Sequence, residues 1–547
     1  MAAGGPSGAA GHGVLASPTR RDREVREPPP RDDVRKPRVP LLDRWHNRRM
    51  DVLDRQACYR AIETRDARFD GRLFVGVTST GIYCRPICPA RTPKFANCRF
   101  FPSAAAAQEV GFRPCLRCRP ETAPDLAFWR GSSNTVSRAL ALMADGALDA
   151  ETGVEALAER LGVGGRQLRR LFKQHLGASP VAVAQTRRVL FAKQLIQETR
   201  MPLGEVALAA GFGSVRRFNE TFRALFRRPP SALRRQLPED APAETGVTLR
   251  LRYRPPYDWP AMLAHLKARA VGGVEHVADG IYQRSIGLNG ALGSIVVAHL
   301  PECSSIAVTI RFPSIRALPA IVARARRVFD VGADIETIGA HLSRDPLLAP
   351  LVAQRPGLRA PGGWEGFELA VRAILGQQVT VAAARRLAAD LVAQFGEPLP
   401  EAYRAHPCLS RVFPTPERIA AADLGGLKMP GARKATLKAL AEAAVADPQL
   451  FRPFGTVEEA IARLRRIRGV GEWTAQYIAL RALRETDAFP ASDIGLLRGA
   501  AINGTRPTPA DLLDRAEPWR PWRAYAAQHL WAADASAAPI AREAVHG

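Results

Sequence analysis

The chain has 547 residues, with 78 lysines and arginines against 53 aspartates and glutamates, and a formal net charge of +25. At roughly 100–200 residues per domain, this length predicts about three to five domains and excludes one large core. No apolar run reaches the ~18–20 residues that span a bilayer, and the first 50 residues lack the apolar region of a secretory signal. These features exclude an integral membrane protein and predict a cytoplasmic one. The positive charge favours an anionic partner such as a nucleic acid.

Residues 1–49 are rich in glycine, alanine, proline and arginine. This composition predicts disorder, because it offers too little apolar surface to offset the entropy of ordering. Translation from Met1 or from Met50 is compatible with the sequence. The charge is uneven: residues 131–237 carry +9, whereas residues 238–547 carry only +6.

Patterns of apolar residues divide the rest of the chain. Residues 51–122 contain short strand-like runs, and apolar residues at three- and four-residue spacing over 135–237 predict helices. After a linker rich in proline, glutamate and alanine, alternation with period two starts at Val247 and again at Ile306, which predicts strands. From about residue 364 the pattern is helical. The expected fold class is therefore multidomain, mainly α with α+β parts.

Six of the eight cysteines lie between Cys58 and Cys118, and four of them form two pairs, Cys84-x3-Cys88 and Cys115-x2-Cys118. Four thiolates at this spacing suit tetrahedral coordination of one Zn²⁺. Without an export signal, such a cluster favours a metal or reactive site over disulfides. On spacing alone, the simplest interpretation is a closed structural zinc site. No organic cofactor is expected.

The residues around the pairs, Ser79 to Pro86 and Gly111 to Cys118, resemble the N-terminal domain of the Ada family of adaptive-response regulators. The resemblance implies that a zinc-bound thiolate, at Cys84, takes a methyl group once from a methyl phosphotriester in the DNA backbone. Zinc keeps sulfur deprotonated at neutral pH, and the thiolate is the nucleophile. Methylation would change the formal charge of the centre from about −2 to about −1, so its affinity for DNA phosphates should rise. Cys98 has no assigned role.

Small residues recur in the basic segment: Ala158 and Gly162 stand four apart, and Ala207 and Gly211 repeat this spacing 49 residues later. Small side chains there allow the two helices of a helix-turn-helix to approach each other. The stretch from Ala209 to Pro230 resembles the AraC-type activators, with Phe212 and Phe218 expected in the core. The residues expected to face bases or phosphates are Arg166, Gln167 and Arg169 in the first recognition helix, and Ser214, Arg216 and Arg217 in the second.

Further on, Arg466 to Trp473 has the pattern of a helix, a Gly-x-Gly turn and a second helix. Gly469 and Gly471 would let the backbone approach a DNA phosphate and direct N–H groups at it, although a plain tight turn has the same pattern. Together with Phe489 to Asp493, this resembles the helix-hairpin-helix glycosylases, and more closely the AlkA type, from about Leu249 to the Trp531 region. Further landmarks are Pro255–Trp259, Arg355–Arg359, Ala373–Gln378 and Pro518–Arg523. The resemblance implies an α+β subdomain like the TATA-binding protein, followed by an all-helical core.

The catalytic carboxylate of this family falls on Asp493. There it can stabilise an oxocarbenium-like sugar as the C1′–N bond breaks, and orient water. The alternative role is to cap the following helix, which Ser492 is able to do instead. Relatives that also cut the strand carry a Schiff-base lysine in the hairpin helix, where this chain has Trp473, and no lysine occurs beyond Lys438. The resemblance therefore implies a monofunctional glycosylase that leaves an abasic site.

Trp473, Tyr477 and Trp531 match aromatic positions that line the family's base pocket. Such a cleft attracts cationic alkylated purines, and packing in the core is the alternative for each ring. Two residues depart from the family pattern. Gln378 stands where an apolar side chain wedges into the duplex, and Ile494 stands where an aromatic ring is expected. These departures bear on base flipping and on substrate range.

The resemblances imply a methyl phosphotriester sensor and transcriptional activator, fused to a glycosylase that excises bases of the 3-methyladenine type. The expected partners are double-stranded DNA, at alkylated sites and a promoter operator, and RNA polymerase, with no membrane. The alternative is a transcription regulator whose C-terminal half binds DNA without catalysis. Direct reversal of base alkylation is not expected, because the Pro-Cys-His-Arg acceptor motif is absent and Cys303 and Cys408 lie in unrelated contexts.

The expected division follows from these patterns and resemblances. It comprises a disordered extension (1–49), an Ada-like zinc domain (50–125), an AraC-type DNA-binding domain (131–237), a linker (238–246), an AlkA-like α+β subdomain (247–355) and a helix-hairpin-helix glycosylase domain (356–540).

Overall fold

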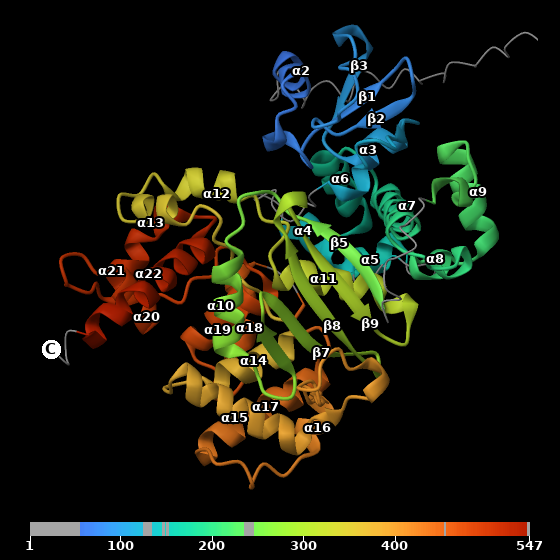
Figure 1. Cartoon of the computed structure of the whole chain (residues 1–547). Helices are drawn as coiled ribbons and strands as arrows, with labels where there is room; N and C mark the ends of the chain where they lie inside the picture. Colours follow the sequence, from blue (N-terminus) through green and yellow to red (C-terminus); the bar gives the residue numbers. More distant parts are fainter. Residues whose placement is uncertain are drawn as a thin grey trace, which may run out of the picture. The chain divides into compact units, whose positions relative to one another are not determined.

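The computed structural model describes residues 55–123, 134–144, 148, 153–234, 246–452 and 456–543 (Figure 1). The extension expected at 1–49, the start at Met50 and all but the last residue of the linker expected at 238–246 lie outside the described residues. None of the described helices combines the length and apolar character needed to cross a membrane.

The cysteine-rich part is a four-stranded sheet with two short helices. Its strands are β1 (Phe74–Val77), β2 (Ile82–Cys84), β3 (Cys98–Phe101) and β4 (Arg113–Pro114), in the order β3-β1-β2-β4, and its helices are α2 (Arg55–Glu63) and α3 (Ala104–Glu109). The strand-like runs expected from the sequence are the β1–β2 hairpin, in which Gly81 has a φ of +65°. The sequence does not reveal β4, because two residues are too few for a period to be visible.

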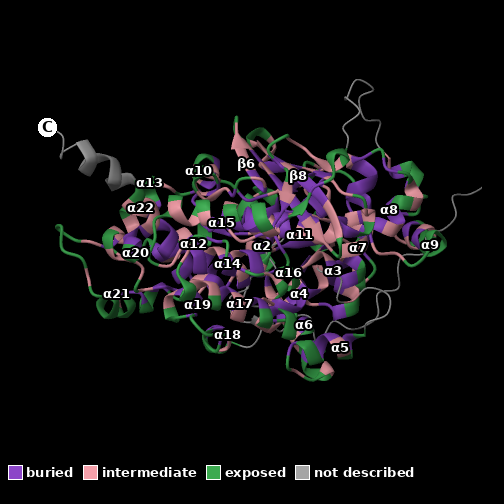
Figure 2. Cartoon of the chain, turned by 90° about the horizontal axis from the view of Figure 1, so that it is seen from below, coloured by how far each residue is buried: buried purple, intermediate pink, exposed green. Residues whose placement is uncertain are grey.

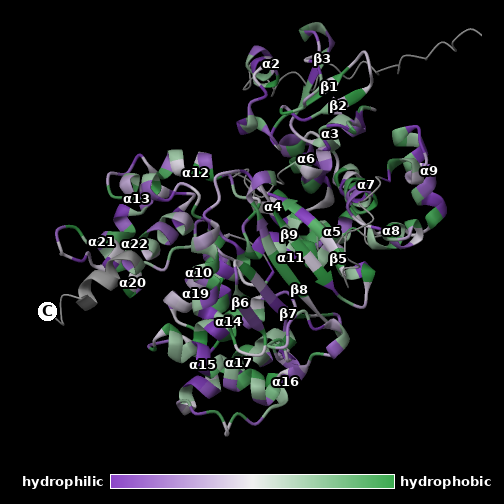
Figure 3. Ribbon diagram, viewed as in Figure 1, coloured by the Kyte–Doolittle hydropathy of each residue, from purple (hydrophilic) through white to green (hydrophobic). Residues whose placement is uncertain are grey.

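The basic middle segment is helical, as predicted. It contains α4 (Asn134–Ala144), α5 (Val154–Arg160), α6 (Gly165–Leu176), α7 (Pro180–Glu198), α8 (Leu203–Ala209) and α9 (Val215–Phe226). Figure 3 shows that α9 carries many hydrophilic residues, whereas its phenylalanines are buried.

The turns α5–α6 and α8–α9 have the same construction. The N–H of Val163 donates to the Ala158 carbonyl and the N–H of Phe212 to the Ala207 carbonyl, each at 3.0 Å. Both alanines are buried, and the glycines of the two turns, Gly162 and Gly211, have φ values of +68° and +79°. The repeated alanine–glycine spacing therefore marks two helix-turn-helix units, because a left-handed backbone favours glycine.

The next part is a five-stranded antiparallel sheet in the order β5-β9-β8-β7-β6. Its strands are β5 (Val247–Arg252), β6 (Glu275–Ala278), β7 (Ile281–Leu288), β8 (Ala291–Leu300) and β9 (Ser305–Arg311), with helices α10 (Trp259–Arg269) and α11 (Leu318–Val328). The predicted alternation is confirmed in β5 and β9, where every second residue is buried; for example, Leu249 and Val308 are fully buried and pair across the two strands.

The rest of the chain is mainly helical, as predicted. Its helices are α12 (Ile335–Leu342), α13 (Leu348–Gln354), α14 (Gly366–Leu375), α15 (Val381–Phe395), α16 (Pro416–Ala421), α17 (Gly431–Ala446), α18 (Val457–Arg465), α19 (Glu472–Ile478), α20 (Ile494–Gly499), α21 (Pro509–Arg515) and α22 (Arg523–Glu543). A π-helical turn (Ala479–Leu483) continues α19, and two short strands, β10 (Glu397–Pro398) and β11 (Arg411–Val412), form a separate pair. The buried residues, purple in Figure 2, run through these helices as one hydrophobic core.

A buried polar network joins the five-stranded sheet part to the helical part. The Asp330 carboxylate accepts hydrogen bonds from the Tyr525 hydroxyl at 2.8 Å, the Ala360 N–H at 3.1 Å and the Arg484 guanidinium at 2.5 Å. Its main-chain carbonyl accepts a bond from Arg359, which is 2% exposed. Charged groups are tolerated there because each has partners, and breaking such a buried set costs several kcal/mol.

We predict that His529 makes the helical part sensitive to acid. Burial lowers the pKa of this imidazole in α22 to about 4. A base whose pKa falls on folding stabilises the folded state fully above its unfolded pKa of about 6.5, and that stability is lost as pH falls towards 4. At pH 5 the loss from His529 is about 2 kcal/mol. Between pH 7 and pH 5, the free energy of unfolding should fall by about 2 kcal/mol less in His529→Gln than in wild type. Guanidinium unfolding followed by tryptophan fluorescence measures this difference. Equal losses would contradict the prediction.

Candidate functional site

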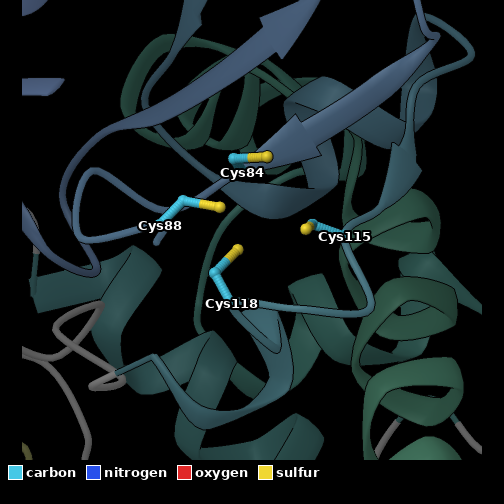
Figure 4. A group of neighbouring side chains, drawn as sticks. All are labelled: Cys84, Cys88, Cys115 and Cys118. Atoms are coloured by element: carbon cyan, nitrogen blue, oxygen red, sulfur yellow. The ribbon is translucent and has the colours of Figure 1, made fainter. Parts of the chain in front are cut away.

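Strands β2 and β4 bring the two cysteine pairs together. The strands run parallel, and the N–H of Cys115 donates to the Tyr83 carbonyl at 3.0 Å, so Cys84 and Cys115 occupy neighbouring strand ends. Cys88 and Cys118 lie in the segments that follow. One sulfur from each residue lies within 4.8 Å of the other three, and the sulfurs point towards a common centre (Figure 4). One parallel strand pair thus brings together two cysteine pairs that are separated by 26 residues in the sequence.

The thiol cluster fits a tetrahedral dication. Zn–S bonds of about 2.3 Å place sulfurs about 3.8 Å apart, which is compatible with four sulfurs that all lie within 4.8 Å of one another. Hydrogen bonding with Cys115 and the other thiols, followed by burial, raises the pKa of the Cys84 thiol. A bound dication favours the thiolate instead, because it supplies the positive charge that the protein atoms lack. The donor set and its geometry therefore match zinc.

Arg85, between the cysteines of the first pair, supports the cluster. Its main-chain N–H donates to the Cys118 sulfur at 3.3 Å, and its guanidinium donates to the Cys118 carbonyl at 3.1 Å and to Thr122 at 2.7 Å. The same guanidinium forms a buried ion pair with Asp70. The sequence did not predict that Arg85 and Asp70 support the cluster. The available signal was the position of Arg85 between Cys84 and Cys88, and the structure buries its side chain.

The outer side of the cluster carries positive charge. Cys84 and Cys88 are half-buried and line a concavity together with Arg91, Arg113 and Arg117. Arginines bind phosphate oxygens with charge-assisted hydrogen bonds. Two of the four sulfurs therefore lie beside a surface that carries three arginines.

The two recognition helices present the residues expected to face DNA. Arg166, Gln167 and Arg169 on α6 are exposed, as are Arg216 and Arg217 on α9. Ser214 is also exposed, but its oxygen caps α9 by accepting the N–H of Arg217 at 3.2 Å.

Residues of both helices form ion pairs and packing contacts. Arg169 pairs with Glu155 at 2.5 Å, and Arg216 pairs with Glu220 at 2.8 Å, so both guanidiniums are held at the helix surface. Phe218 is fully buried, as expected, and Phe212 is half-buried and packs against its edge, with ring centroids 5.2 Å apart.

Asp493 is the centre of a second cluster, in the helical part. Its Oδ1 accepts three hydrogen bonds, from the N–H groups of Gly495 at 2.9 Å and Leu496 at 3.1 Å and from the Trp531 indole at 2.9 Å. Its Oδ2 accepts one, from the Trp473 indole at 2.8 Å. Oδ1 is therefore fully engaged in hydrogen bonds that hold the structure, whereas Oδ2 can still accept a further hydrogen bond.

The expectation that Ser492 caps α20 in place of Asp493 is wrong. Asp493 itself is the N-cap of α20, and Ser492 is exposed and does not cap it. The reason is geometric, because only the side chain of Asp493 points along the helix axis towards the first free N–H groups. A cap and a catalytic carboxylate are compatible here, since the two oxygens have different partners.

The three aromatic residues expected around the base are half-buried and surround Asp493. The rings of Trp473 and Tyr477 stack with centroids 5.4 Å apart and an angle of 16°, and Tyr477 meets Trp531 edge-on at 6.2 Å. All three rings retain exposed surface, and two of them donate to the Asp493 carboxylate. Tyr477 and Trp531 also pack against the hydrophobic core.

A buried arginine lies behind these rings and was not expected from the sequence. The guanidinium of Arg481, in the π-helical turn, lies 4.9 Å from the centre of the Trp531 ring and 5.9 Å from that of Tyr477. Burial raises the pKa of the Tyr477 phenol, but the charges of Arg269 and Arg481 outweigh it and lower the net pKa. π-Helical turns are frequent at functional sites, yet the sequence carries no signal for them.

Two glycines let α20 approach α22 closely. Gly495 and Gly499 stand four apart and face the same helix, where an added Cβ would lie 3.1 Å from the Trp531 ring at position 495 and would overlap the Leu530 carbonyl at 499. This close approach allows the Trp531 indole to reach Asp493. The signal in the sequence was a Gly-x3-Gly directly after the aspartate.

The hairpin turn between α18 and α19 is exposed at Gly469 and Gly471. It is tied to the turn between α14 and α15, because the Gln377 amide donates to the Gly469 carbonyl at 3.2 Å and to Thr474 at 2.9 Å. The next residue, Gln378, is exposed with a φ of +54°, which is rare for a residue other than glycine. Strained, exposed residues of this kind gather at functional sites.

Four families match successive parts of the chain. The metal binding domain of Ada matches residues 57–121, a helix-turn-helix domain 157–236, the AlkA N-terminal domain 248–365 and the HhH-GPD superfamily of base excision DNA repair proteins 371–521. A relative from Mycobacterium tuberculosis, described as a "probable bifunctional transcriptional activator/DNA repair enzyme AlkA", is 43% identical over 87% of this chain and 96% of its own length. The chain belongs to this family of bifunctional activator and repair proteins.

Two further relatives of this chain each match one part of it. DNA-3-methyladenine glycosylase 2 of Escherichia coli is 39% identical over 51% of this chain and 95% of its own length. The bifunctional transcriptional activator/DNA repair enzyme AdaA of Bacillus subtilis is 30% identical over 32% of this chain and 81% of its own length. The resemblances inferred from motifs and the expected multidomain fold class are confirmed.

We predict that Gly469 is required for the hairpin and that Gly471 is not required for folding. Gly469 has a φ of +84°, and an added Cβ would overlap the Thr436 hydroxyl, so Gly469→Ala should lower the free energy of unfolding by about 1–3 kcal/mol. Gly471 has an ordinary φ of −82° and open space around it, so Gly471→Ala should leave stability within about 0.5 kcal/mol. Chemical unfolding measures both, and equal losses would contradict the assignment. Weaker binding of undamaged duplex DNA by Gly471→Ala would then report the phosphate contact itself.

Proposed function

We propose that the C-terminal half is a DNA-3-methyladenine glycosylase that removes alkylated bases by hydrolysis. The observation that carries this proposal is the Asp493 carboxylate, which two indole N–H groups hold at the edge of an aromatic cluster. Trp473, Tyr477 and Trp531 offer ring faces and edges on which a flipped base can stack. The family relationship agrees with this chemistry, since a relative of this half is named for it.

Asp493 would act on the sugar, not on the base. As the C1′–N bond breaks, positive charge develops on the sugar ring, and a carboxylate at that place stabilises it and can orient the attacking water. The bond electrons leave with the base, water supplies the new C1′–O bond, and its proton passes to solvent or to Oδ2. No lysine follows Lys438, so an imine that would lead to strand cleavage has no donor in this region. The product is then an abasic site.

Gln378 and the hairpin would hold the duplex during this step. The exposed Gln378 amide on its left-handed turn can fill the space of the flipped base and form hydrogen bonds with the opposite base, which an apolar wedge cannot do. The N–H groups near Gly469 and Gly471 would bind a phosphate through the helix N-terminus of α19. The Gln377 bridge keeps the two elements in register.

Asp493→Asn should lower the rate of 3-methyladenine release by roughly 10²- to 10³-fold, because it removes the charge while keeping a good N-cap. Release of 3-methyladenine and 7-methylguanine from alkylated duplex DNA measures this effect. Ser492→Ala is the matched control and should behave as wild type, since Ser492 does not cap α20. Unchanged release by Asp493→Asn would overturn the residue assignment. A wild type without release would favour the alternative, a regulator whose C-terminal half only binds DNA.

We propose further that the N-terminal half senses methyl phosphotriesters and activates transcription. When bound, Zn²⁺ would hold the four sulfurs as thiolates at neutral pH. Cys84 would then attack the methyl carbon: the new S–C bond forms, the C–O bond breaks, and the electron pair returns to the phosphate oxygen. The thioether no longer carries charge, so repulsion between the centre and DNA phosphates falls, and Arg91, Arg113 and Arg117 dominate the local field.

The recognition helices α6 and α9 would read the operator. We propose that Arg166, Gln167 and Arg169, with Ser214, Arg216 and Arg217, contact its bases and phosphates, in a protein that acts with RNA polymerase in the cytoplasm. The proposed functional division is sensor over 50–125, operator binding over 131–237 and glycosylase over 247–355 and 356–540. Exposure of these side chains and the basic charge of the segment support the proposal.

Mass spectrometry of the zinc-loaded protein after exposure to methyl-phosphotriester DNA should place one methyl group on Cys84. Cys84 and Cys88 lie in one tryptic peptide, so fragment ions between them must separate the two sulfurs. The peptide that carries the buried Cys98 is the internal control and should stay unmodified. Operator affinity should rise with the methylated fraction, by at least about tenfold, as one negative charge disappears near phosphates. No methyl group despite bound zinc would leave the cluster a purely structural site.

A further inference from the structure

Two histidines and a cysteine gather at the edge of the five-stranded sheet, in the glycosylase half. His276 lies on the edge strand β6, and His406 and Cys408 lie in the loop before β11. One donor atom from each of the three lies within 4.8 Å of the others. The imidazole rings of His276 and His406 are stacked, with centroids 4.1 Å apart and an angle of 12°. Among the described residues, the His276 ring nitrogens and the Cys408 thiol have no hydrogen-bond partner.

Main-chain contacts hold the two segments that carry these donors next to each other before any ligand binds. Gly273, three residues before His276, accepts hydrogen bonds from the N–H groups of Ser410 at 2.9 Å and Arg411 at 3.0 Å. It also pairs with Leu409, which is fully buried. The loop that carries His406 and Cys408 is therefore fastened to the start of β6. Main-chain segments that are already fixed lower the entropic cost of binding a ligand, because only the side chains have to be ordered.

We propose that His276, His406 and Cys408 bind a metal ion of the Zn²⁺ class, separately from the four-cysteine cluster. Imidazole nitrogen and thiolate sulfur are the donors that zinc and cobalt prefer. Bonds of about 2.0–2.1 Å to nitrogen and 2.3 Å to sulfur place donors about 3.3–3.6 Å apart. Rotation of the three side chains closes the remaining gap, and the fourth position is left to water.

The hydrogen bond within the loop agrees with this assignment. Nδ1 of His406 accepts the main-chain N–H of Cys408 at 3.1 Å, which orients the imidazole beside the residue that carries the thiol. On binding, a coordinate bond replaces this hydrogen bond, and the Cys408 thiol releases its proton to solvent. Cys408 is exposed, which gives the ion a path to the site.

The ion would fasten an otherwise open sheet edge. Among the described residues, β6 has β7 as its one neighbour in the sheet, so it is an edge strand, and edge strands present backbone groups to other segments. A metal bridge from His276 to the 406–408 loop holds the loop over that edge. The site therefore stabilises the glycosylase half without entering its chemistry.

Cobalt titration of the full chain tests this site. Protein loaded with one equivalent of Zn²⁺, which the four-cysteine cluster takes first, is titrated with Co²⁺ and followed by absorption. Wild type should bind one further equivalent, with the visible bands of tetrahedral Co²⁺ and a thiolate-to-cobalt charge-transfer band. Because loss of a residue that merely supports a ligand costs about 10- to 100-fold in affinity, His276→Ala should cost more than about 100-fold. Cys408→Ser should abolish the charge-transfer band.

Cys303→Ser is the matched control, since this half-buried thiol lies outside the cluster, and it should bind Co²⁺ as wild type does. Metal analysis after dialysis should give two ions per chain for wild type and one for His276→Ala. Unchanged glycosylase activity in each variant would report intact folding. One ion in wild type, or a wild-type cobalt spectrum in His276→Ala and Cys408→Ser, would overturn the proposal, the latter because the cobalt would then occupy the four-cysteine cluster.

Discussion

The glycosylase half depends on one carboxylate that four N–H groups share. Asp493 caps α20, binds the Trp473 indole at the start of α19 and binds the Trp531 indole of α22. Three helices are therefore positioned relative to one acidic side chain, and the aromatic rings are oriented by the same bonds. The proposed reactive role and the structural role are compatible because a carboxylate has two oxygens, of which one carries three of the four hydrogen bonds. A substitution that preserves the cap and removes the charge separates these roles.

Charge balance governs the sensor half in a similar way. Four cysteine sulfurs crowd around one point, supported by the buried Arg85–Asp70 pair and flanked by exposed arginines. In the proposed zinc-loaded centre, four thiolates and one dication leave a formal charge of about −2, so the loss of a single negative charge would change its interaction with phosphate appreciably. The electrostatic consequence of the proposed methyl transfer would need no large conformational change. A small module would then be sufficient for a chemical signal.

Both halves bind DNA through different physical means. The helix-turn-helix segment presents exposed arginines on α6 and α9, in the most basic stretch of the chain. The hairpin of the glycosylase half presents main-chain N–H groups, and its flanking turn presents the uncharged Gln378. An enzyme that must leave each site gains from weaker electrostatic attraction, whereas an activator must remain on its operator. The modest charge of the C-terminal half agrees with this difference.

The sequence by itself determined the order of the parts, the four sulfur ligands, the paired helix-turn-helix units and the aspartate with its three aromatic neighbours. These features are short in sequence or repeat with a fixed spacing, so local patterns encode them. The sequence did not predict the supporting contacts, which are those of Arg85 with Asp70, of Gln377 with the hairpin and of Arg481 with the aromatic rings. It also did not predict that Asp493, and not Ser492, caps α20. Each depends on segments that are far apart in the chain or on a one-residue difference in side-chain direction. The cluster of His276, His406 and Cys408 is of the same kind, because 130 residues separate the two histidines and only the pairing of Gly273 with the loop brings them together. Periodicity and spacing report local structure, whereas the partners of buried charges and metal donors are decided by tertiary packing.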